Sequence, residues 1–255
     1  MKRSSTNLRR RATATAGTAL LVLLAGCSDS GESDRTGGDT EPRSAPSGTR
    51  STAQLEGAAV TGNDLPGQRI TGRMDKDRIK PAQVTTSQPE CLIQAQIAAG
   101  IAVGDPASVA ERTAVGNVTE ESRAGLEERE LTTTVTLASY TGKGAEDVLF
   151  DLGKAGTVCR TPFDVTVRGE TLKAQSVPET KDPGGGGLGD SYAWFTLTRG
   201  AGTDAVTHQV LVVEMGRTLG FISREHPGGT TAQAPVHIPF PEAIAKVQVK
   251  KFRSS

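Results

Sequence analysis

Side chains that commonly perform catalysis or bind metals are few in this sequence, and their spacing suits neither task. The three histidines, His208, His226 and His237, form no H-x-x-x-H or His-Glu pattern of a zinc site. A serine hydrolase needs a serine on a G-x-S-x-G turn together with a histidine base, and that motif does not occur. We therefore predict a protein that is not an enzyme, with no metal ligand and no cofactor, and interpret the histidines as structural.

A glycine run and the aromatic residues after it leave two alternatives open. Gly184, Gly186 and Gly189 match G-x-G-x-x-G, but a dinucleotide-binding loop must follow a strand and open a helix. Strand-like residues follow these glycines, so we expect a flexible loop, with a binding lid as the alternative. Tyr192 and Trp194 then share one face of a strand, where they either pack in the core or face a groove.

Cys27 is the residue for which the sequence indicates a specific modification. Five basic residues lie within the first eleven, and an uncharged stretch rich in alanine and leucine runs from Ala12 to Ala25, which is typical of an export signal. The run Leu24-Ala25-Gly26-Cys27 resembles a bacterial lipobox. That resemblance implies cleavage before Cys27 and transfer of a diacylglyceryl group to its thiol. An ordinary secreted protein with an incidental cysteine is the alternative.

These features predict the location and organisation of the chain. We expect a signal peptide over residues 1–26, a lipidated N-terminus and disordered spacer over 27–53, and an extracytoplasmic domain over 54–255. The spacer is polar and cannot bury enough apolar surface to fold. Because two acyl chains hold a protein stably on a bilayer, the domain would stay on the outer face of the cell membrane.

The remaining cysteines favour the same compartment. If lipid occupies Cys27, only Cys91 and Cys159 remain, and such a pair in an exported chain indicates a disulfide bond. A loop of the 67 residues between them would contribute about 4 kcal/mol to stability in the chain-entropy description. A metal site would need further ligands, and no histidine lies three to five residues from either cysteine.

Charge and hydropathy exclude two broad classes of protein. The chain has 255 residues with 29 basic and 29 acidic side chains, and without residues 1–26 the balance is 24 to 29. This mildly acidic balance argues against a nucleic-acid partner. No apolar run reaches the ~18–20 residues of a membrane-spanning helix.

Periodicity predicts a single α+β domain, a mostly antiparallel β-sheet with two to four flanking helices. Val210–Val213 is apolar on both faces and should belong to a central strand, and Gly216-Arg217 should join two strands in a hairpin. Period-two patterns place strands at residues 107–118, 128–141, 163–167, 191–198, 205–215 and 218–224. Three-to-four spacing places helices at residues 89–102, 142–159 and 242–252.

Several features of the chain occur in a characteristic order: the break Asp64-Leu65-Pro66-Gly67, the helices bearing Cys91 and Cys159, and the hairpin over residues 210–222 followed by a closing helix. In these features the chain resembles the extracellular sensor domains of actinobacterial receptor serine/threonine kinases and of stand-alone lipoproteins. The resemblance implies a disulfide between the two cysteines and non-catalytic binding of an extracellular ligand in a cleft beside the sheet.

Three functions are consistent with the sequence. The first is a lipid-anchored, sensor-like module for an envelope ligand or protein partner. The second is a cell-envelope hydrolase with an unrecognised site, which predicts that His208 or a pair of carboxylates converges in a large pocket. The third is a structural or assembly lipoprotein, which predicts an exposed apolar patch and no deep pocket.

Overall fold

The computed structural model describes residues 48–116, 131–179, 188–202, 205–227 and 241–255, all within one compact unit. The predicted signal peptide and Cys27 lie outside these residues, as do most of the spacer, His237, Gly184 and Gly186. Among the described residues, no helix has the length and apolar character needed to cross a bilayer.

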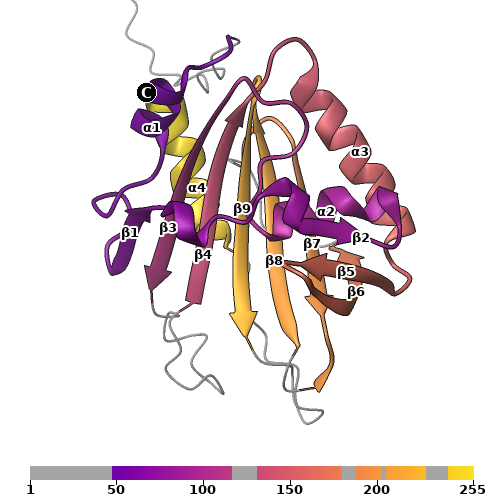
Figure 1. Ribbon diagram of the computed structural model, residues 1–255. Coiled ribbons are helices and arrows are strands. Elements are labelled where there is room, and N and C mark those ends of the chain that lie inside the picture. Colours follow the sequence, from indigo (N-terminus) through magenta and orange to yellow (C-terminus); the bar gives the residue numbers. More distant parts are fainter. Residues whose placement is uncertain (1–47, 117–130, 180–187, 203–204, 228–240) are drawn as a thin grey trace, which may run out of the picture. The chain divides into compact units, whose positions relative to one another are not determined.

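One antiparallel sheet organises the domain, and the predicted α+β class is confirmed (Figure 1). Its strands follow the order β1-β3-β4-β9-β8-β7-β6-β5-β2, so β8 is central, as its apolar run predicted. The strands are β1 (Gln68–Gly72), β2 (Val84–Thr86), β3 (Ser108–Gly116), β4 (Leu131–Ser139), β5 (Phe163–Val167), β6 (Glu170–Pro178), β7 (Tyr192–Arg199), β8 (Val206–Met215) and β9 (Thr218–Pro227).

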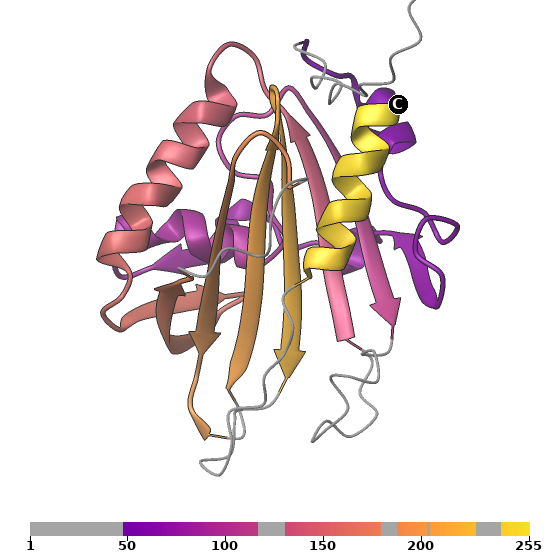
Figure 2. The same cartoon turned by 180° about the vertical axis from the view of Figure 1, so that it is seen from behind.

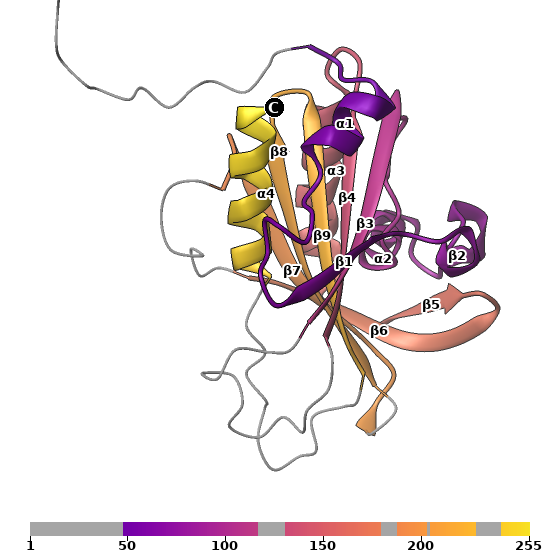
Figure 3. The ribbon, with the colours of Figure 1, turned by 90° about the vertical axis from the view of Figure 1, so that its left-hand side faces the viewer.

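Helices cover both faces of the sheet. They are α1 (Thr52–Ala58), α2 (Leu92–Ala98), α3 (Gly144–Val158) and α4 (Glu242–Ser254), with 3-10 turns η1 (Asp75–Asp77), η2 (Pro81–Gln83) and η3 (Pro89–Cys91). One buried cluster joins α2 and α3 to the sheet, and a second joins α1 and α4 to its other face. Figure 2 shows α4 lying across the strands, and Figure 3 shows α1 and α4 on the side opposite α2.

The predicted disulfide is present. Cys91 precedes the first turn of α2 and Cys159 follows the last turn of α3, with Cα atoms 5.6 Å apart. Both helices lie on the same face of the sheet, which brings the two cysteines within reach of each other. The bond therefore ties the two helices of this face together at the core, where both cysteines are fully buried.

The folded region begins earlier than the predicted boundary at residue 54, because local capping outweighs the polar composition there. Ser51 caps α1, accepting a hydrogen bond from the Gln54 backbone, while the Gln54 side chain accepts one from the Ser51 backbone. The buried Arg50 guanidinium donates to the Phe252 carbonyl and to the Ser255 hydroxyl. Residues 48–53 thus belong to the domain.

The sequence-based prediction missed three strands and placed one helix end too late in the chain. The short edge strands β1 and β2 and the solvated strand β6 have few buried apolar residues, so their periodicity is weak. The helix expected to reach residue 102 ends at Ala98. Gly100 terminates it at φ 74°, and a Cβ there would lie 2.6 Å from Arg73 Nη1.

Candidate functional site

The sheet face beneath α2 and α3 changes from apolar to polar along its strands. Phe221 and Val212 lie opposite each other in the buried part of the β8–β9 ladder. Further along the same strands, His208 lies opposite Glu225. Because directly paired residues of an antiparallel ladder project on the same face, this end of the sheet carries a continuous polar surface.

Threonines extend that polar surface across the neighbouring strands. Thr113 of β3 pairs with Thr134 of β4, which pairs with Ser223 of β9, and Thr132 pairs with Glu225. The alternation in β4 places Leu131, Thr133, Val135 and Leu137 on the opposite face. The remaining threonines of β4 are consequently directed toward α2.

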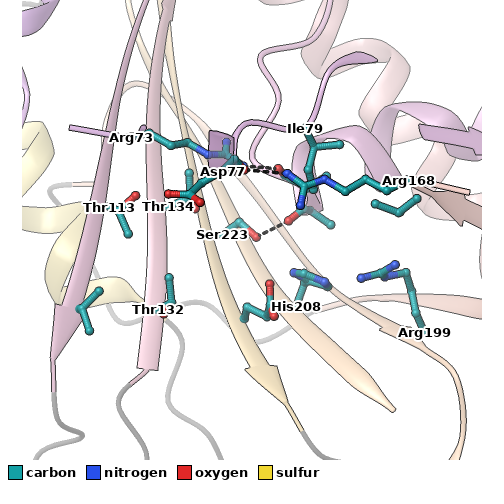
Figure 4. A pocket seen from close by; sticks show the side chains of 16 residues that line it. Arg73, Asp77, Ile79, Thr113, Thr132, Thr134, Arg168, Arg199, His208 and Ser223 are labelled. Carbon is teal, nitrogen blue, oxygen red and sulfur yellow. Dashed lines mark hydrogen bonds between the residues drawn. The ribbon is translucent and has the colours of Figure 1, made fainter. Parts of the chain in front are cut away.

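A cavity of about 360 Å³ lies over this polar surface (Figure 4). The sheet forms its floor, and three alanines of α2 and its C-terminal end, Ala95, Ala98 and Ala99, form part of its roof. The turn between β5 and β6 and the segment from Arg73 to Ile79 complete its walls. Small residues at the end of α2 leave the space that larger side chains would fill.

Arg73 fixes the end of α2 above the cavity. Its Nη1 donates to the Gly100 carbonyl at 2.8 Å and its Nη2 to the Ala99 carbonyl at 3.1 Å. These carbonyls are left unpaired by the end of the helix, where a positive charge is favourable. Arg73 also lies 3.6 Å from Glu111, and both side chains are nearly buried. Burial lowers the pKa of Arg73, and Glu111 partly opposes that shift.

Arg168 enters the cavity wall from the tight turn between β5 and β6. Its φ is 51°, and it is the one non-glycine residue with positive φ in the described part of the chain. Its Nη2 donates to the carbonyls of Lys76, Asp77 and Arg78 at 3.3–3.4 Å. The contacts connect the β5–β6 turn to η1 and the residue that follows it, and Figure 4 shows Arg168 beside Asp77.

His208 of β8 and Arg199, the last residue of β7, also line the cavity. His208 is only 4% exposed, and within the described residues its Nδ1 has no hydrogen-bond partner. Burial, reinforced by the nearby Arg199 charge, lowers the pKa of His208 to about 3, so the imidazole is neutral near pH 7. Burial lowers the pKa of Arg199 as well, and Glu225 and Glu170 partly oppose that shift.

A second cavity, of about 470 Å³, lies between α3 and β7. Tyr192, Trp194 and Phe195 all line it, and Phe195, at 2% exposure, also belongs to the core cluster under α2 and α3. Trp194 also packs against the cluster under α1 and α4, so core packing and a groove both describe its position. The Gln94 Oε1 atom is buried at this site without a hydrogen-bond partner in the described part of the chain.

The structure confirms some of the predicted site residues, places one of them in a cavity and does not describe another. Cys91 and Cys159 meet as expected, whereas Cys27 lies outside the described residues. His208 was interpreted as structural, yet it lines the first cavity. No group of three or more His, Cys, Asp or Glu side chains suited to a metal occurs in the described ranges. Sequence reasoning missed Arg168 and Arg199, although the Arg168-Gly169 pair after an apolar strand was a usable turn signal.

Comparisons with known proteins find similarity among solved structures. No family model matches the chain, and no curated protein matches it by sequence. Among solved structures, the extracellular domain of PknH from Mycobacterium tuberculosis is 11% identical, with a TM-score of 0.49. The match covers 82% of this chain and 100% of the other. At that TM-score the similarity identifies no family, so the resemblance to kinase sensor domains stays a prediction.

Proposed function

We propose that this protein is a lipid-anchored, extracytoplasmic, sensor-like binding protein that holds a small ligand in the cavity beneath α2 without chemical change. The observation that carries the proposal is the buried His208, whose Nδ1 has no partner among the described residues, at the wall of a 360 Å³ cavity. An unpaired buried polar atom costs about 1–3 kcal/mol. Such a cost is expected where a ligand supplies interactions to the surrounding site.

Lipid attachment at Cys27 supports the extracytoplasmic part of the proposal. The basic residues, the apolar stretch and the cysteine occur in the order that lipoprotein export requires. The Cys91–Cys159 disulfide favours an oxidising compartment. Replacing Cys27 by Ala should move the protein from the membrane fraction to the soluble fraction, and retention at the unmodified level would contradict the anchor.

The alternative of an envelope hydrolase is less consistent with His208. A general base works best when its pKa lies near the working pH, and burial lowers that of His208 to about 3. Nor does His208 form a hydrogen bond with a hydroxyl or carboxylate of the described residues, as a catalytic base would. The Ser223 hydroxyl is engaged instead with the Ala98 carbonyl at 2.8 Å.

A fragment screen tests whether the cavity binds ligands. Ligand-observed NMR of a fragment library with the full chain in detergent should yield hits that Thr132→Phe abolishes, because that side chain lines the cavity and is exposed. Thr85→Phe, on the exposed edge strand β2, is the matched control and should keep the hits. Fragments should be recovered chemically unchanged.

Two results would contradict the proposal. Hits that survive Thr132→Phe would lie elsewhere on the molecule, and a complete lack of hits would mean that the cavity has no binding role. Conversion of a bound fragment to product, lost in His208→Gln, would favour the hydrolase.

A further inference from the structure

We propose that the cavity beneath α2 binds a small hydroxylated anion, such as a sugar acid or a sugar phosphate, with its charged group between Arg168 and Arg199. The inference rests on the proposed function and specifies its ligand class. The cavity volume of about 360 Å³ exceeds that of one sugar ring, leaving space for a substituent or ordered water.

The arginines around the cavity differ in how many of their donors are engaged. Arg73 is occupied by three carbonyls and Glu111, so its role is structural. Arg168 uses only Nη2, in three long contacts. The Arg199 guanidinium forms no side-chain hydrogen bond or ion pair of 4 Å or less with any described residue, although the charges of Glu225 and Glu170 act on it. Since each guanidinium carries five N–H donors, Arg168 and Arg199 retain most of theirs for a ligand.

The two available guanidinium groups are placed to act together. Figure 4 shows Arg168 and Arg199 on the same side of the cavity, with the His208 ring close to Arg199. Guanidinium donors form short, charge-assisted hydrogen bonds to carboxylate and phosphate oxygens, often in bidentate pairs. The neutral His208 ring adds hydrogen-bonding capacity beside this pair without adding a charge.

Acidic and hydroxyl groups on the floor favour a ligand that is more than a bare anion. Glu225 lies opposite His208 in the ladder, and it would repel a second negative charge while accepting hydrogen bonds from hydroxyl groups. The hydroxyls of Thr113, Thr132 and Thr134 line the floor and form no hydrogen bond to any described residue. A ligand with one anionic group and several hydroxyls would pair with the two arginines and also form hydrogen bonds with Glu225 and the threonines.

The backbone at Arg168 is a second, independent observation. A two-residue hairpin turn with positive φ at both positions strongly favours Asn, Asp or Gly at the first position. Arg168 occupies that position at φ 51°, followed by Gly169 at φ 87°. A bulky side chain is strained in this conformation. The chain therefore carries an unfavourable residue where its long side chain reaches the cavity.

The test compares sugars that differ in charge. The full chain in detergent is titrated with glucuronate, glucose 6-phosphate and glucose at constant ionic strength, following the arginine Nε–H and histidine ring signals by NMR. The two anions should bind with Kd on the order of 1 mM, as expected for ligands of about 13–16 heavy atoms, and glucose at least about tenfold more weakly. Arg199→Gln should weaken anion binding about tenfold or more.

Arg217→Gln is the matched control, because Arg217 is exposed in the β8–β9 turn at the other end of these strands. It should leave all affinities unchanged. Binding of glucuronate alone or of glucose 6-phosphate alone would identify the anionic group, and both outcomes support the proposal. Equal binding of glucose and the anions, unaffected by Arg199→Gln, would overturn it.

Failure of this inference can be distinguished from failure of the proposed function. If no sugar binds but uncharged fragments give hits that Thr132→Phe abolishes, the cavity binds a ligand of another class and the anion inference is wrong. If neither sugars nor fragments bind, the proposed binding function is wrong as well.

Discussion

His208 should make the stability of this protein unusually sensitive to mild acid. Its pKa is about 3 in the folded state, because the ring is buried and lies near Arg199, against ~6.5 in an unfolded chain. Glu225 and Asp77 also line this cavity, but the dominant cause is burial. As pH falls below ~6.5, the unfolded state therefore binds a proton that the folded state does not, and folding becomes less favourable.

The magnitude follows from the two pKa values. Each unit of difference corresponds to about 1.4 kcal/mol, so the loss of stability relative to neutral pH is about 2 kcal/mol at pH 5. It would approach about 5 kcal/mol only near the folded pKa of about 3. His208→Gln removes the titrating group while keeping a polar side chain of similar size. The variant should consequently lack this part of the pH dependence.

The assay is chemical denaturation of the unmodified protein and His208→Gln between pH 7.5 and pH 5, with the disulfide intact. Carboxylates common to both chains contribute equally and cancel in the difference. Between pH 7.5 and pH 5, the unfolding free energy of His208→Gln minus that of the unmodified protein should rise by about 2 kcal/mol. A difference that stays constant within about 0.5 kcal/mol would refute the reasoning, since it would mean that His208 titrates normally in the folded protein.

Three further predictions concern the scaffold. Replacing Cys91 and Cys159 by Ala should lower stability by about 4 kcal/mol in a thermal or chemical melt, and two free thiols in unreduced protein would contradict the bond. Asp64→Asn should cost about 1 kcal/mol of stability at pH 7, because the partly exposed Asp64 accepts a 2.6 Å hydrogen bond from Lys251 that holds its pKa near 2. This stabilisation should disappear as pH falls from about 4 through about 2. A cost that persists below that range would indicate a packing effect. Arg168→Asn should raise stability by about 1 kcal/mol while weakening anion binding, and a loss of stability would show that its carbonyl contacts outweigh the backbone cost.

The elements that the sequence predicted are those whose periodicity is set by burial. The β3–β4 pair, α3 and the β8–β9 hairpin bury one face or both, so their alternation is strong. In β6, Ala174 and Ser176 are the buried residues, and both are small, so composition there does not distinguish a strand from a loop. The capping box at Ser51 was a local signal that the polar composition of the spacer concealed.

The cavity could not be predicted because it depends on strand register. His208 and Glu225 are 17 positions apart and face each other only through the pairing of β8 with β9. Thr132 and Thr134 alternate with buried residues in β4, which reads equally well as a solvent-facing side. That side becomes the floor of a cavity because α2 ends early, at Ala98, where Gly100 packs against Arg73.

The contact between Arg50 and the last turn of α4 also determines how force enters the domain. Tension on the chain preceding residue 48 would reach Arg50, whose guanidinium is bonded to the Phe252 carbonyl and lies 3.8 Å from the centre of the Phe252 ring. The pull would pass into α4 and then into the cluster on the sheet face opposite α2. The Thr49 hydroxyl and the Arg50 backbone are also hydrogen-bonded to Tyr140, Ser139 and Ser108 at the ends of β3 and β4, so mechanical load on a tether would be shared between α4 and the sheet itself.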